Sequence, residues 1–64
     1  MDPLDLVFDL DALNRWIEEV GAEEAARQMW LAAKRYRATH SEEEVREMGQ
    51  RIDWAVARIE EFEL

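Results

Sequence analysis

Cysteine is absent from this 64-residue sequence, and the chain has two glycines, one proline and one histidine. Without cysteine, neither a disulfide framework nor a thiolate metal site is available. Stability must therefore come from packing, in a chain near the lower size limit for an independent core. The sequence also has no glycine-rich phosphate loop. His40 has no second histidine to complete a transition-metal site, so we expect neither cofactor nor metal.

Basic residues are few as well, with 8 Lys and Arg against 16 Asp and Glu, a net charge of −8. Such a charge repels phosphate backbones and anionic lipid, so we expect no nucleic acid and no membrane, and favour a neutral or basic protein partner. The chain is 38% charged and 48% hydrophobic, too charged for a membrane span and too apolar for disorder. No basic residue precedes position 11, so no secretory signal is expected. We expect one soluble domain over residues 1–64.

Apolar residues recur every three or four positions, which is the spacing of one face of a helix. The predicted helices cover residues 3–20, 22–39 and 42–63. Their short connections predict an all-α, antiparallel up-down-up three-helix bundle. The expected core stripes contain Leu6, Leu10, Leu13, Ile17, Val20, Ala26, Met29, Ala33, Tyr36, Val45, Met48, Ile52, Ala55, Val56, Ile59 and Phe62. Residues 4–8 also fit an extended arm, with Asp9 or Asp11 as a later helix cap.

Capping residues support the predicted helix boundaries. Asp2 before Pro3 favours a helix start, because Asp accepts from free backbone donors and Pro at the first position loses no needed N–H. Gly21 is a typical left-handed helix end. Ser41 and Glu44 form a capping-box pattern, in which each side chain accepts from the other's backbone N–H.

The carboxylates and hydroxyls do not form a catalytic pattern. Most carboxylates fall on solvated helix faces or in first turns. The Asp9 to Asp11 segment lacks the ligand spacing and central glycine of a calcium loop. Ser41 is used as a cap and has no activating base. A bundle of this size also leaves little room for a pocket, so we expect no enzyme and no catalytic residues.

Several apolar residues fall outside the expected core stripes, together with nearby cations. The candidate partner-binding residues are Leu4, Val7, Phe8, Arg27, Trp30, Leu31, Lys34 and Trp54. Tryptophan is enriched at binding hot spots, which favours an interface for the outward Trp54. A single exposed residue such as Leu4 needs no such explanation. Trp16 and Tyr36 lie nearer the core faces and are expected to pack there.

One flat epitope can combine residues from two neighbouring helices at most. The handedness of the bundle decides which residues meet. In one hand the N-terminal candidates lie beside Trp30 and Leu31, and in the other Trp30 and Leu31 lie beside Trp54 and Ala57. The predicted helix 22–39 contributes in both cases. It carries four basic and two acidic residues, whereas the flanking segments are each net −5. The expected surface is thus an apolar strip with a basic rim on an acidic body.

These features resemble de novo designed three-helix mini-protein binders. The resemblance is carried by the Asp2-Pro3 start, the Glu19-Val20-Gly21 break, the Ser41-Glu42-Glu43-Glu44 box and the cysteine-free amphipathic helices. It implies an engineered binding module that docks a two-helix face onto a target such as a viral glycoprotein or a cell-surface receptor. We expect a monomer when the module is unbound.

Other features are more typical of a natural protein. Seven of the eight basic residues are Arg, and Met29, Met48, His40 and Gly49 also differ from the usual designed composition. Glycine inside a helix costs about 1 kcal/mol relative to alanine, which predicts either a close helix approach at Gly49 or natural history. The alternatives are therefore a small acidic bacterial or phage regulator or inhibitor, and a self-associating helical protein.

Overall fold

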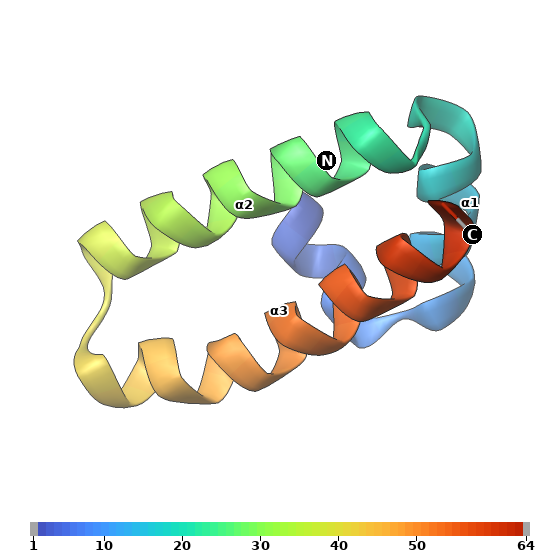
Figure 1. The fold of residues 1–64 in the computed structure, drawn as a ribbon. Helices are drawn as coiled ribbons and strands as arrows, with labels where there is room; N and C mark the ends of the chain where they lie inside the picture. Colours follow the sequence, from blue (N-terminus) through green and yellow to red (C-terminus); the bar gives the residue numbers. More distant parts are fainter. Residues whose placement is uncertain (1, 64) are drawn as a thin grey trace.

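The computed structural model describes residues 2–63, which form four helical segments and no strand (Figure 1). The segments are the 3₁₀ helix η1 (Pro3–Phe8) and the α-helices α1 (Leu10–Val20), α2 (Ala22–Thr39) and α3 (Glu42–Glu63). The all-α prediction is confirmed, and so are the predicted bounds of the second and third helices. None of the described helices is long and apolar enough to cross a membrane.

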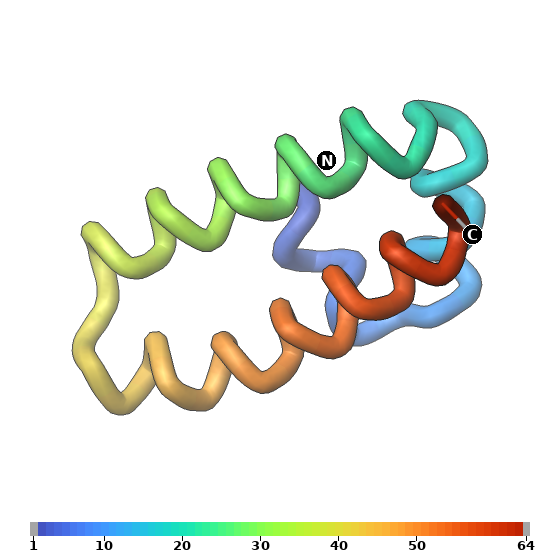
Figure 2. The backbone as a smooth tube through the Cα atoms, viewed as in Figure 1, coloured from blue at the N-terminus to red at the C-terminus, as the bar shows by residue number. Residues whose placement is uncertain are grey.

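The long helices α2 and α3 run antiparallel as a hairpin (Figure 1). The 3₁₀ helix η1 packs against both of them and crosses the space between them (Figure 2). At the end of the hairpin where α2 begins and α3 ends lies α1. A hydrogen bond ties α1 to α3, because Arg58 Nε donates to Asn14 Oδ1 at 3.0 Å.

The single helix predicted over residues 3–20 is wrong, because the chain breaks at Asp9. The Asp2 side chain accepts from the Leu4 N–H at 3.0 Å and begins η1. Asp9 then adopts an extended backbone, with φ −140° and ψ 101°, and accepts from the Ala12 N–H at 3.1 Å to begin α1. The later cap is therefore at Asp9, as the alternative allowed, but residues 4–8 form a 3₁₀ helix and the alternative of an extended arm is wrong.

The predicted capping box is present, and Gly21 ends α1 as predicted, although its ψ of 150° places it outside the left-handed helical region. Gly21 has a positive φ of 90°, which favours glycine, and its N–H donates to the Ile17 carbonyl at 2.8 Å. In the capping box, the Ser41 N–H donates to Glu44 Oε1 at 3.1 Å and the Glu44 N–H donates to Ser41 Oγ at 3.3 Å. These local hydrogen bonds mark the end of α1 and the start of α3, and they leave only short connections between the helices.

The core lies where η1, α1, α2 and α3 meet. Its buried apolar residues are Leu6, Val7, Leu13, Ile17, Ala25, Met29, Ala32, Ile52, Ala55 and Ile59. Three of the ten are alanines on α2 and α3, and small residues allow neighbouring helix backbones to approach. The break at Asp9 allows η1 to bury Leu6 and Val7 together, which a straight helix with the predicted stripe would not do.

Several residues depart from the sequence-based expectation, and Tyr36 and Val45 are two predicted core residues that the core cluster does not include. Leu10 and Phe62 were expected in the core but are 46% and 38% exposed. Leu10 turns outward because it opens α1 after the break, and Phe62 lies in the last turn of α3, with the Arg58 guanidinium 5.5 Å from its ring centroid. Val7, expected at the edge of the stripe, is fully buried. A Cβ on Gly49 would meet nothing within 4 Å, so no close helix approach explains this glycine.

Candidate functional site

The outer face of α2 carries two large apolar side chains that the core does not cover. Trp30 is 55% exposed and Leu31 is 46% exposed, while Met29, directly before them in the sequence, is fully buried. Residues three and four apart share a helix face. The residues that line one open hollow of about 550 Å³ on this face are Arg27, Trp30, Leu31, Lys34 and Arg37. We call this set the α2 strip.

One end of the α2 strip is held by an ion pair. Arg27 Nη2 lies 2.6 Å from Glu24 Oε2, and Arg27 Nε donates to the same carboxylate at 3.1 Å. Gln28 Nε2 also donates to Glu24 Oε2 at 3.1 Å. The hydrogen bonds from Arg27 and then Gln28 lower the pKa of Glu24, and the same carboxylate raises the pKa of Arg27. The pair therefore stays ionised near neutral pH and restricts the orientation of the Arg27 side chain.

The remaining cations of the strip are free of such pairing. Within residues 2–63, no carboxylate forms an ion pair with Lys34 or Arg37. Helix α2 as a whole has four basic and two acidic residues, a net charge of +2. The rest of the chain has the other 4 basic and 14 acidic residues, a net charge of −10. The strip is therefore a locally basic surface on an acidic protein.

The three N-terminal candidates are separated by the fold. Val7 is fully buried, so the prediction that it contributes to a surface is wrong. Leu4 is partly buried and packs against the core. Phe8 is 63% exposed, but it faces α3, where the Arg51 guanidinium lies 5.5 Å from its ring centroid. Its surroundings form a smaller hollow of about 290 Å³ lined by Phe8, Tyr36, Glu44, Glu47, Met48 and Arg51.

Trp54 is 41% exposed on α3, in agreement with its predicted outward direction. The hollow of the α2 strip, however, is lined by residues of α2 alone. It unites Arg27, Trp30, Leu31 and Lys34, as expected for one helix face, and adds Arg37. Sequence reasoning missed Arg37, although its position three residues after Lys34 places it on the same face.

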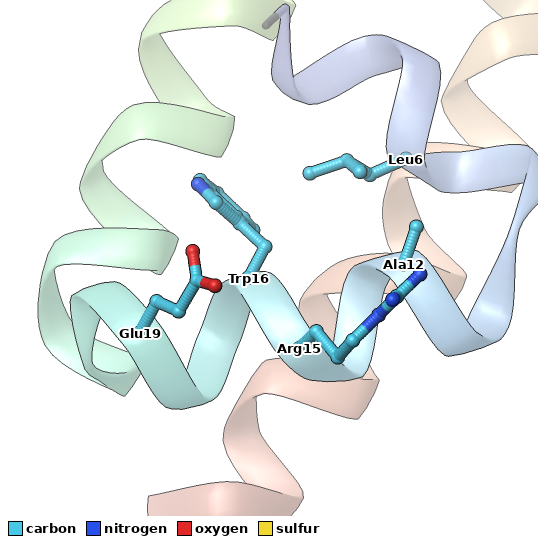
Figure 3. Close-up of a pocket in the computed structure, with 5 residues that line it drawn as sticks. All are labelled: Leu6, Ala12, Arg15, Trp16 and Glu19. Atoms are coloured by element: carbon cyan, nitrogen blue, oxygen red, sulfur yellow. The ribbon is translucent and has the colours of Figure 1, made fainter.

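A third hollow, of about 380 Å³, lies beside α1 and is lined by Leu6, Ala12, Arg15, Trp16 and Glu19 (Figure 3). Trp16 is partly buried and packs on the core, as predicted, and the Glu19 carboxylate lies beside its indole ring (Figure 3). The charged groups of Arg15 and Glu19 are on exposed residues at the surface. No arrangement of a nucleophile and a base is formed by the five residues that line this hollow.

His40 and the buried polar groups of the described chain have structural partners. His40 stacks on Tyr36 with ring centroids 3.6 Å apart, and its Nδ1 lies 3.0 Å from the Tyr36 carbonyl oxygen and 2.9 Å from Thr39 Oγ1. Among residues 2–63, no three His, Asp or Glu side chains are grouped so as to hold a metal ion, and no buried side-chain polar atom lacks a hydrogen bond. The α2 strip can offer apolar contact and cationic donors, which is the chemistry of a binding surface.

Comparison with protein-family models, with curated proteins and with solved structures gave no match.

Proposed function

We propose that this protein is a binding module without catalytic activity, which docks the α2 strip onto a folded protein partner. The observation that carries the proposal is the adjacent exposure of Trp30 and Leu31, 55% and 46%, within one hollow lined by cations. Tryptophan and arginine are enriched at binding hot spots, and charged residues commonly surround an apolar centre. The strip has both elements on one rigid helix.

The apolar pair is large enough to anchor a complex. A tryptophan buries roughly 150–250 Å² when fully covered, so the part of Trp30 still exposed corresponds to about 2–3 kcal/mol of transfer free energy. The exposed half of Leu31 adds about 1 kcal/mol. Together these terms correspond to a factor of roughly 10² to 10³ in affinity. A partner that covers both side chains would gain about 3–4 kcal/mol of binding free energy from them.

The finer architecture is part of the same proposal. We propose that α1, α2 and α3 form an up-down-up bundle, with η1 as an additional packed segment. The very short connections at Gly21 and at His40 to Ser41 support this topology, because short loops favour antiparallel neighbours. In this arrangement the outer face of α2 is open to a partner along its full length.

An engineered origin is proposed on the resemblance to designed three-helix binders. The capping box at Ser41 and Glu44 and the glycine at the first junction are devices that designers use to stop and start helices. The target proposed from that resemblance is a viral glycoprotein or a cell-surface receptor.

A display screen with matched variants tests the proposed docking face. Labelled protein is screened against yeast-displayed viral glycoprotein and receptor ectodomains, and each bound ectodomain is then titrated with variants. We expect the Trp30→Ala/Leu31→Ala double variant to bind about 100-fold more weakly, and Trp54→Ala to bind like the parent protein. Ectodomains that retain the double variant but lose Trp54→Ala would place the interface on α3 and contradict the proposal.

A further inference from the structure

Resting on the proposed docking of the α2 strip, we infer that its partner is a protein surface whose apolar centre is rimmed by carboxylates. Arg27, Lys34 and Arg37 line the same hollow as the apolar pair. No carboxylate lines that hollow within the described chain, although the sequence contains 16 of them. A partner that covers the apolar pair must therefore bring its own groups close to three cations.

Local charge determines this preference more than net charge does. The Debye length is about 8 Å at physiological ionic strength, and the molecule measures 33 × 21 × 16 Å along its principal axes. Acidic groups on the far side of the protein are about two Debye lengths from the strip and are largely screened there. The net charge of −8, from which a neutral or basic partner is expected, is therefore a weaker guide to this face than the three cations that line it.

The free cations are the part of the strip that most requires a partner. Arg27 already pairs with Glu24, whereas Lys34 and Arg37 have no ion-pair partner within residues 2–63. These two groups keep their donors available for incoming carboxylates. Arg27 and Arg37 are ten residues apart on α2, a distance of about 15 Å along the helix axis. A partner helix of about three turns, with acidic residues flanking apolar ones, would match this length.

Two other occupants fit the strip less well, a second copy because of its charges and a lipid surface because of the small apolar area. A second copy docked through the same face about a two-fold axis would bring like charges together, because the cations of each strip would face the same cations of the other copy. A membrane-surface helix needs a wide apolar face, but the apolar face of α2, with Ala25, Met29 and Ala32, is already buried in the core. The strip leaves two large apolar side chains, which is little for lipid insertion.

The test uses three synthetic amphipathic peptides of about five helical turns. They share the same leucine and tryptophan positions and carry Glu, Gln or Lys at every rim position. Each is titrated into ¹⁵N-labelled protein, and amide chemical shifts report both affinity and location. We expect the Glu peptide to bind most tightly, with the largest shifts over residues 27–37, and its affinity to fall as salt rises.

Matched charge variants separate the strip from general electrostatics. Lys34→Gln/Arg37→Gln removes the two free cations, and Arg15→Gln/Arg35→Gln removes the same charge from positions that do not line the hollow. For the Glu peptide we expect roughly three- to thirtyfold weaker binding to Lys34→Gln/Arg37→Gln, which is the affinity that two exposed ion pairs contribute. For Arg15→Gln/Arg35→Gln we expect binding to weaken by less than about twofold.

The outcomes distinguish the partner chemistry from the docking face. If the Gln or Lys peptide binds residues 27–37 as tightly as the Glu peptide, the acidic partner is excluded and the docking face stands. If no peptide binds, or the shifts lie on α3, the proposed docking face fails as well. Shifts over residues 27–37 produced by protein concentration alone, or more strongly by phosphatidylserine vesicles than by the Glu peptide, would overturn the inference in favour of a second copy or of lipid.

Discussion

The break at Asp9 reverses the expected importance of Val7 and Leu10, and this reversal can be measured. Val7 is fully buried, so Val7→Ala removes two buried methyl groups, at about 0.8 kcal/mol each, and leaves a cavity. We expect a loss of about 2–3 kcal/mol in the free energy of unfolding. Leu10 is 46% exposed, so Leu10→Ala should cost about 1 kcal/mol or less, although it deletes more carbon atoms.

Urea denaturation followed by far-UV circular dichroism gives both values from the transition midpoint and slope. For a chain of this size, 1 kcal/mol shifts the melting temperature by about 4–8 °C, so the two variants should differ by roughly 5–15 °C. If Leu10→Ala proves the more damaging substitution, residues 3–20 form one continuous helix with the stripe predicted from the sequence. That result would refute the packing of η1 described above.

Three further predictions concern the caps and glycines. Gly49→Ala should stabilise the protein by about 0.5–1 kcal/mol, because nothing lies within 4 Å of the added Cβ, whereas Gly21→Ala should destabilise it by about 1–2 kcal/mol because its φ is 90°. Thermal denaturation measures both changes, and equal effects would contradict the helical conformation of Gly49. Ser41→Ala should cost about 1 kcal/mol through loss of the capping box, measured by urea denaturation, and an unchanged midpoint would contradict a role for this cap. Hydrogen bonds from the Ser41 backbone N–H and hydroxyl lower the pKa of Glu44 below its usual 4.5. The ionised Glu44 therefore stabilises the fold above pH 4.5, and this stabilisation is lost as the pH falls through the pKa of Glu44 in the folded protein. Glu44→Gln should flatten this part of the stability–pH curve, and an unaltered curve would contradict the hydrogen bonds.

The elements that sequence reasoning predicted correctly are those with local causes. Ser41 and Glu44 are three residues apart, and their reciprocal hydrogen bonds need no other part of the chain. The periodicity of α2 likewise turns Leu31 outward whatever packs on the other side. Gly21 ends α1 for a reason confined to its own backbone conformation.

The elements that sequence reasoning missed depend on distant contacts. Asp2 and Asp9 both read as helix caps. The choice between one long helix and two short segments depends on the packing of η1 against α2 and α3, which buries Val7. The exposure of Phe62 has a similar cause, because the periodic pattern continues to the end of α3 whether or not a neighbour covers the last turn. Which helix faces lie side by side is also not encoded in periodicity. The position of Phe8 beside Arg51 could therefore not be predicted.

The outer face of α2 is the proposed binding surface of this protein. The clearest test is to titrate ¹⁵N-labelled protein with the first ectodomain recovered from the display screen and to map the amide chemical shifts of the protein. We expect the largest perturbations at residues 27–37, around Trp30 and Leu31, with small changes elsewhere. Perturbations centred on Trp54 of α3, or on the hollow beside Trp16, with residues 27–37 unaffected, would contradict it.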